Sequence, residues 1–223
     1  MVQPVKRETT IQCEQGFTLV ELLIAMVLTI LAAVGMYKLL VDYNTSGNVM
    51  DQLVELQENC RVAMDRMSAE IRMAGYDPTT LAKAKISPKS DDTSLIFSMD
   101  ENEDGDIDDP GEQITYVLAD LDGDAILDLV RTDINGSGAQ QVITNVSALE
   151  FFYVDKDGNP VAPGSFTSSV EIAMVIRTTN EDYRITDNND YQTRRGTTIL
   201  SNPNDKFHRR LIEQTVKCRN NGI

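Results

Sequence analysis

Apolar residues form one long run near the start of the chain. The twenty residues from Phe17 to Met36, FTLVELLIAMVLTILAAVGM, contain a single charged side chain, Glu21. As an α-helix this segment would measure about 30 Å, the thickness of the hydrocarbon core of a bilayer. The pattern predicts a transmembrane helix or, as the alternative, a secretory signal peptide, whose small-residue cleavage site the AAVG at 32–35 would imitate.

The following segment changes from uniformly apolar to periodic. Acidic side chains lie mostly on the other faces of a helix drawn through it, and Gly75 and Pro78 predict where that helix ends. We therefore predict that residues 39–76 continue the helix in amphipathic form and pack on the rest of the protein. The apolar positions recur mainly at steps of three and four: Met50, Leu53, Cys60, Met64, Met67 and Ile71.

Short apolar runs dominate from Ser94 onward and predict β-strands separated by Gly, Asn, Asp and Pro. The DKDGNP at 155–160 predicts a hairpin turn. A long helix followed by antiparallel strands indicates an α+β fold, with residues 77–223 forming a β-rich globular domain. The predicted strands are 94–99, 113–119, 125–134, 147–155, 170–179 and 208–218.

Composition excludes several classes of function. The net charge is −15, with 35 acidic residues against 20 basic ones, and no Lys- or Arg-rich run offers a surface for nucleic acid. The single histidine, His208, and the absence of CxxC spacing leave no His/Cys metal site. No GxSxG, Walker A or GxGxxG motif is present. We predict that the protein is not an enzyme and does not bind nucleic acid.

Glu21 is the anomaly of the apolar run, because a carboxylate at bilayer depth costs about 2.5–3.5 kcal/mol and normally has a partner. The sequence from Gly16 to Glu21, GFTLVE, resembles the signature of type IV prepilins. The resemblance implies that an inner-membrane peptidase cuts after Gly16 and methylates the new N-terminal Phe17. Residues 1–16, including Cys13, would be a discarded leader, and 17–38 the transmembrane and filament-core helix.

The same resemblance suggests a partner for Glu21. Cleavage would expose an α-ammonium on Phe17, and the Glu21 carboxylate of an incoming subunit would pair with that amine on a subunit already in the filament. A low dielectric makes such a pair strong. We therefore predict that Glu21 is an assembly residue.

The stretch AEIRMAGYDP at 69–78 resembles the PilW group of minor pilins and the related J-type pseudopilins, and VKCRN at 216–220 resembles the PilW group. The PilW resemblance implies a single-pass protein of the inner membrane, with its C-terminal domain in the periplasm and later at the pilus tip. It would prime pilus assembly within a tip complex. Its partners would be other minor and major pilins, the prepilin peptidase that also methylates, and the pilus assembly platform.

Two alternatives stay open at this point. A J-type pseudopilin of type II secretion would share the architecture and serve another machine. A calcium-dependent adhesion or binding module could also use a pilin anchor.

The acidic residues point to a structural calcium ion as the one cofactor. Twelve carboxylates lie between Asp100 and Asp128, with no Lys or Arg from 90 to 130. In DENEDGDID the oxygen-bearing residues occupy positions 1, 3, 5 and 9 of an EF-hand-type loop, and Gly105 takes the turn position. Gly111 stands at position 12, where a Glu is expected, and Glu112 is one residue late. The candidate ligands here are Asp100, Asn102, Asp104, Asp106, Asp108 and Glu112.

A second acidic run, DLDGDAILD, repeats the spacing with Asp120, Asp122, Asp124 and Asp128. It is a poorer loop, because Ala125 replaces the turn glycine and Arg131 occupies position 12. The two runs could each bind calcium, or they could face each other across a hairpin and share one ion.

After cleavage the remaining cysteines would be Cys60 and Cys218. An oxidising periplasm permits a disulfide between the helix and the last strand. Two separate buried thiols are the alternative.

Overall fold

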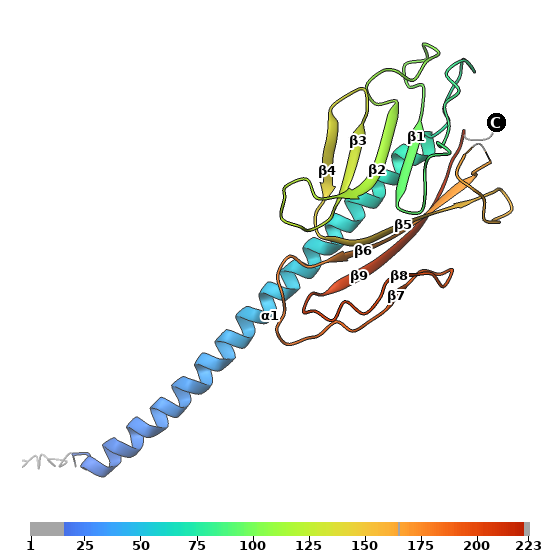
Figure 1. Cartoon of the computed structure of the whole chain (residues 1–223). Helices are drawn as coiled ribbons and strands as arrows, with labels where there is room; N and C mark the ends of the chain where they lie inside the picture. Colours follow the sequence, from blue (N-terminus) through green and yellow to red (C-terminus); the bar gives the residue numbers. More distant parts are fainter. Residues whose placement is uncertain (1–15, 165, 221–223) are drawn as a thin grey trace, which may run out of the picture. The chain divides into compact units, whose positions relative to one another are not determined.

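The computed structural model describes residues 16–164 and 166–220. These residues form one α-helix, α1 (Leu19–Met73), followed by nine β-strands (Figure 1). The chain divides into two compact units, Met1–Asn48 and Val49–Ile223, and α1 contributes residues to both. Of the predicted leader only Gly16 belongs to the described part, whereas residues 1–15, with Cys13, lie outside it.

Two antiparallel sheets make up most of the second unit (Figure 1). The first is a four-stranded meander in which each strand pairs with the next one along the chain. Its strands are β1 (Ser94–Ser98), β2 (Gln113–Ala119), β3 (Asp128–Asp133) and β4 (Gly138–Ile143).

The second sheet has three strands, in the order β5-β6-β9, so that the last strand of the chain pairs with β6. A separate two-stranded ribbon, β7 with β8, lies in the connection between β6 and β9. The strands are β5 (Val146–Val154), β6 (Ser169–Arg177), β7 (Tyr191–Gln192), β8 (Thr198–Leu200) and β9 (Arg209–Lys217).

The C-terminal part of α1 supplies one side of the core. Its buried residues follow the predicted three- and four-residue steps, which place them on one face of the helix. Met50 is an exception to the prediction, because its side chain is 61% exposed. The buried residues of α1 are Leu56, Cys60, Ala63, Met64, Met67, Ser68 and Ile71.

α1 ends at Met73, three residues before the predicted boundary of 76. Gly75 takes a φ of 80°, a left-handed conformation that costs glycine little and that commonly closes a helix. Its N–H donates to the carbonyl of Ser98, at the end of β1, at 2.9 Å. The glycine therefore stops the helix and ties its end to the first sheet.

The α+β fold class is confirmed, and each of the six predicted strands overlaps an observed one. β3 begins at Asp128, three residues later than predicted, because residues 125–127 belong to the preceding loop. β4, β7 and β8 were not predicted. β4 is an edge strand with the polar sequence GAQQVI, in which most residues keep contact with water. The predicted turn at 155–160 is present, with the Asp155 N–H donating to the Asn159 carbonyl at 3.0 Å.

The predicted disulfide is not formed, since Cys60 and Cys218 are buried free thiols. Cys60 lines the same groove as Arg210 of β9. The N–H of Arg219, next to Cys218, instead donates to the carbonyl of Arg72 at 3.4 Å. Arg72 lies twelve residues beyond Cys60, about 18 Å along the helix. That prediction is wrong, because a disulfide needs Cα atoms about 4.4–6.8 Å apart.

The packing of α1 predicts a sharp difference between two of its methionines. Met67 is fully buried, so Met67→Ala should lower the free energy of unfolding by about 2–5 kcal/mol. Met50→Ala, at an exposed position, should change it by less than about 0.5 kcal/mol. Denaturant unfolding of the full chain in detergent measures both. Equal effects would contradict the assignment of the buried face.

Candidate functional site

Thr18 and Glu21 close the N-terminus of α1. The backbone N–H and the hydroxyl of Thr18 each donate to Glu21 Oε2 at 2.9 Å, and the Glu21 N–H donates to Thr18 Oγ1 at 3.3 Å. This reciprocal arrangement is a capping box, which satisfies donors that the first helical turn leaves without partners. It was not predicted, although the Thr-x-x-Glu spacing in TLVE is its sequence signature.

The capping box uses only part of the Glu21 carboxylate. Both bonds from Thr18 end on Oε2. Among the interactions of the described residues, Oε1 is therefore still open to another donor. The capping role and the predicted pairing with an α-ammonium are compatible on one side chain.

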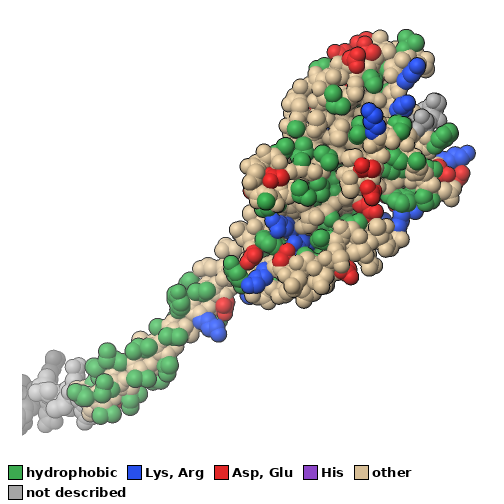
Figure 2. All heavy atoms as spheres, viewed as in Figure 1, with side chains coloured by type: hydrophobic (Ala, Val, Ile, Leu, Met, Phe, Trp, Pro, Cys, Tyr) green, Lys and Arg blue, Asp and Glu red, His purple; other side chains and the backbone are tan. Residues whose placement is uncertain are grey.

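The helix that follows exposes its apolar side chains. Every residue from Gly16 to Asn48 is exposed, and Phe17 is 89% exposed. Figure 2 shows hydrophobic side chains covering this part of α1. By its length and composition α1 could cross a membrane. So much apolar surface requires cover by lipid or by other helices.

The first acidic loop, residues 100–112, connects β1 to β2 and is anchored by Asp100. This aspartate is fully buried, and its N–H donates to the carbonyl of Tyr76 at 2.7 Å. Its Oδ2 accepts hydrogen bonds from the Gly105 N–H at 3.1 Å and the Thr79 hydroxyl at 3.4 Å. Its Oδ1 is also buried, and no group in the described residues donates to it.

Three exposed or partly exposed carboxylates of the same loop gather close together. Oxygens of Asp104, Asp106 and Asp109 lie within 4.8 Å of one another. The Asn102 amide donates to Asp104 at 3.0 Å and to Asp109 at 2.7 Å. The Asp106 backbone N–H, which donates to Asp104, contributes most to lowering the pKa of that carboxyl. Asp108, a predicted ligand, is not in this group, and its unpredicted neighbour Asp109 takes its place.

Glu112 reaches back into this loop, as its late position suggested. It is buried, and its Oε1 accepts the Glu101 N–H at 3.0 Å. Its Oε2 accepts the Asp109 N–H at 3.2 Å. Glu112 therefore holds the loop backbone in shape with both of its oxygens.

The second acidic loop, residues 120–127, connects β2 to β3 and is more open. Oxygens of Asp120, Asp122 and Asp124, all exposed, lie within 4.8 Å of one another. Asp120 is fully engaged, since its Oδ1 accepts the Gly123 N–H at 2.7 Å and its Oδ2 the Ala125 N–H at 2.9 Å. The first of these bonds contributes most to lowering its pKa.

The remaining ligands predicted for this loop behave differently. Although Asp122 accepts a hydrogen bond from the Asp124 N–H, its pKa is raised by partial desolvation and by the neighbouring negative charges. Asp128 is buried at the start of β3, where it accepts the side-chain amide of Gln141 and, at 3.1 Å, the N–H of Asn145. Asp128 therefore binds Gln141 of the neighbouring strand β4 and does not belong to the carboxylate cluster.

The two acidic loops lie at opposite ends of β2. This strand has seven residues, which corresponds to about 24 Å. The prediction of one shared ion is therefore wrong.

The two loops nevertheless share a backbone conformation. Positions 4 and 6 have positive φ in both: 65° at Glu103 and 93° at Gly105, then 82° at Gly123 and 65° at Ala125. Each loop thus has glycine at one of these positions and an ordinary residue at the other, in opposite order. Ala125, which replaces the expected turn glycine, adopts the turn at a steric cost.

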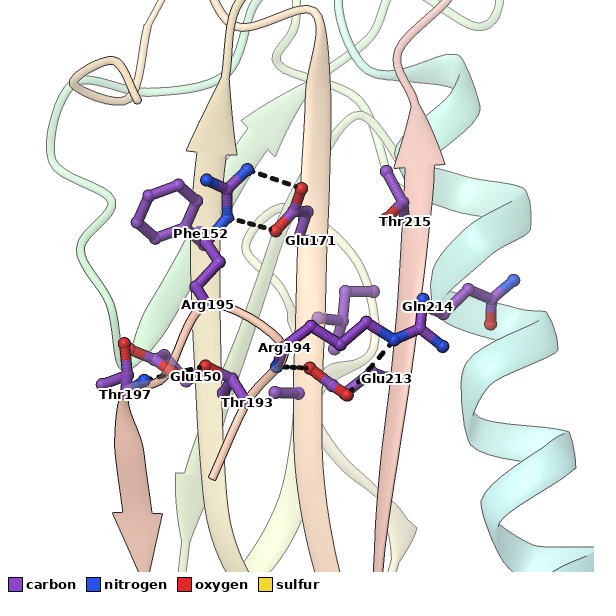
Figure 3. A pocket seen from close by; sticks show the side chains of 12 residues that line it. Glu150, Phe152, Glu171, Thr193, Arg194, Arg195, Thr197, Glu213, Gln214 and Thr215 are labelled. Atoms are coloured by element: carbon purple, nitrogen blue, oxygen red, sulfur yellow. Dashed lines mark hydrogen bonds and ion pairs between the residues drawn. The ribbon is translucent and has the colours of Figure 1, made fainter. Parts of the chain in front are cut away.

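A pocket of about 260 Å³ lies against the sheet formed by β5, β6 and β9 (Figure 3). Arg195 stacks on Phe152, 4.1 Å from the ring centroid, and forms hydrogen bonds of 2.6 and 2.8 Å with Glu171. The Arg194 N–H donates to Glu213 at 2.7 Å. Arg194 and Arg195 thus form ion pairs with two glutamates that line the same pocket.

Taken together, the capped apolar helix and the α+β unit that follows it define a type IV pilin-like protein. Residues 11–37 match the prokaryotic N-terminal methylation motif, which covers Gly16, Phe17 and Glu21. Residues 50–221 match the family described as prepilin peptidase-dependent protein B. That match spans most of the chain, and the chain belongs to this family.

The chain also shows a weak similarity to a solved pilin-like structure. The type IV-like pilin TTHA1219 from Thermus thermophilus is 14% identical, with a TM-score of 0.46, over 75% of this chain and 98% of that one. Among curated proteins, none matches the sequence.

Because the two acidic loops share a backbone conformation, we predict that two substitutions have opposite effects on the stability of the protein. Ala125→Gly should stabilise the protein by about 1 kcal/mol, because glycine adopts a positive φ without a Cβ clash. Gly105→Ala should destabilise it by more than about 1 kcal/mol. A Cβ at Gly105 would lie 3.3 Å from Leu81 Cβ and Thr79 Oγ1. Thermal unfolding of the two variants measures both effects. A destabilised Ala125→Gly protein would contradict the backbone strain that we assign to Ala125.

Proposed function

We propose that this chain is a non-catalytic minor pilin that primes assembly of a type IV pilus. It waits in the inner membrane with its β-rich unit in the periplasm, and then joins other pilins at the tip of the filament. The observation that carries this proposal is the exposed apolar helix, which directly follows a prepilin cleavage motif. The Glu21 carboxylate caps the N-terminus of this helix.

The chemistry of the N-terminus supports this order of events. Cutting between Gly16 and Phe17 releases the polar leader and creates an α-ammonium at the first residue of the mature chain. Methylation of that amine leaves it able to carry a positive charge. In the apolar interior of a helix bundle such a charge needs a counter-ion, and Glu21 of a neighbouring subunit supplies it.

The apolar part of α1 then has two successive environments. In the membrane its side chains face lipid, and in a filament they face the equivalent helices of other pilins. Neither environment requires a change in the helix itself, because the intrahelical hydrogen bonds already satisfy the backbone. The partners of this segment are the prepilin peptidase, the assembly platform and other minor and major pilins.

Deleting the gene tests the proposal against its closest rival. Surface filaments are counted by electron microscopy, and secreted proteins are compared in the same cultures. We expect loss of pili with normal secretion. Normal pili with secreted proteins trapped in the periplasm would instead assign the chain to a type II secretion machine as a J-type pseudopilin.

If Glu21 both caps the helix and acts as a counter-ion, a substitution can remove one of these roles and keep the other. Glu21→Gln preserves a capping box, since glutamine also serves at this position, but it removes the negative charge. We expect this variant to be cleaved after Gly16 and to reach less than about one-tenth of normal incorporation into filaments, which corresponds to losing about 1.4 kcal/mol of assembly free energy. Mass spectrometry of the mature N-terminus and immunoblots of sheared pili measure the two steps.

Thr18→Ala is the matched control. It removes the hydroxyl from the capping box and keeps the carboxylate, so its cost falls on the helix terminus, at about 1 kcal/mol. We expect near-normal incorporation. If Thr18→Ala fails to assemble while Glu21→Gln assembles normally, capping is the role of Glu21 and the counter-ion model is lost.

A further inference from the structure

We propose that the loop at residues 100–112 binds one calcium ion and that the loop at residues 120–127 does not. The proposal does not depend on the assembly role, because it concerns only the β-rich unit. Clustered acidic residues are common on protein surfaces and would not carry it. The buried Asp100 distinguishes the two loops.

Asp100 points to a missing partner. A buried carboxylate oxygen without a hydrogen-bond donor is unfavourable, and native proteins rarely leave one. Asp100 Oδ1 is in this state within the described residues. The other oxygen accepts the Gly105 N–H at 3.1 Å, so the carboxylate faces the turn of the acidic loop. A cation held in that turn would satisfy Oδ1.

The surrounding oxygens suit a hard cation. Calcium takes six to eight oxygen ligands from carboxylates, amide carbonyls, backbone carbonyls and water, in a flexible geometry. Asp100, Asn102 and Asp104 stand at loop positions 1, 3 and 5, which supply ligands in EF-hand loops. Asp104, Asp106 and Asp109 already bring oxygens within 4.8 Å of one another. Magnesium, which demands octahedral geometry and gives up water reluctantly, is a poorer match.

The second loop lacks the feature that the first one shows. Both oxygens of its position-1 residue, Asp120, accept backbone N–H groups of the loop itself. Both oxygens of its position-9 residue, Asp128, accept hydrogen bonds, one from the Gln141 side-chain amide and one from the Asn145 N–H. The three clustered carboxylates, Asp120, Asp122 and Asp124, are exposed to water. Water and mobile counter-ions screen such charges without a dedicated site.

Calcium in the first loop would brace the end of α1 against the first sheet. Asp100 joins the loop to Tyr76, three residues past the helix, through a backbone bond of 2.7 Å. The Tyr76 hydroxyl donates to Glu103 within the loop at 2.8 Å. The Met99 N–H, just after β1, donates to the carbonyl of Glu112 at 2.9 Å. Fixing the loop therefore stabilises three segments at once.

Calcium titration of the mature chain in detergent tests the proposal, after divalent cations have been removed with a chelator. Isothermal titration calorimetry with calcium chloride should give one site per chain. Calcium at one hundred times its dissociation constant should raise the midpoint of thermal unfolding by roughly 5–10 °C. Magnesium at the same concentration should raise it less.

Asp104→Asn and Asp124→Asn form a matched pair, because both change an exposed aspartate at position 5 of its loop. Asp104→Asn should weaken calcium binding roughly tenfold or more, whereas Asp124→Asn should leave it unchanged. Without calcium the two variants should unfold at nearly the same temperature, which shows that both fold. Asp100→Asn should also lose the calcium-dependent stabilisation.

Tyrosine-sensitised terbium luminescence gives a second readout, because Tyr76 contacts the first loop and the protein contains no tryptophan. The signal should fall in Tyr76→Phe and in Asp104→Asn and persist in Asp124→Asn. Three outcomes would overturn the proposal. These are no calcium binding by the unmodified chain, loss of binding in Asp124→Asn with retention in Asp104→Asn, and equal loss in both variants.

Discussion

The buried face of α1 between Leu56 and Ile71 is the contact on which the globular unit depends. The two main sheets share no pair of strands, yet residues of both join α1 in one apolar cluster. A polar contact fixes the helix against the first sheet, since Glu70 accepts hydrogen bonds from the Tyr116 hydroxyl at 2.8 Å and from Arg131 Nε at 3.0 Å. Apolar packing holds the layers together, and this partly buried carboxylate restricts how they can slide.

The sequence predicts the fold best where burial imposes a strong pattern. The helix that carries Met64 and Met67 and the strands with buried, alternating side chains were all found, because their periodicity directly reflects which face meets the core. β4 escaped prediction because an edge strand in contact with water keeps no such pattern. Its residues become a strand through pairing with β3, which is a tertiary interaction.

The candidate sites show the same division. The Thr18–Glu21 cap is local in sequence and was open to prediction from spacing alone. The roles of Asp109 and Asp128 were not, because each depends on where the chain places partners such as Asn102 or Gln141. The distance between the two cysteines likewise follows from how β9 runs along α1. Neighbours in sequence can be read from a pattern, whereas neighbours brought together by folding cannot.

The state of those cysteines determines how the globular unit responds to its surroundings. Burial raises the pKa of the Cys60 thiol to about 11 and that of Cys218 to about 12, so both stay protonated at neutral pH. A protonated, enclosed thiol is a poor nucleophile and reacts slowly with oxidants or disulfides. The folded unit therefore keeps both cysteines as thiols without a bridge between them, and its enclosed thiols are protected from oxidants that attack accessible thiolates.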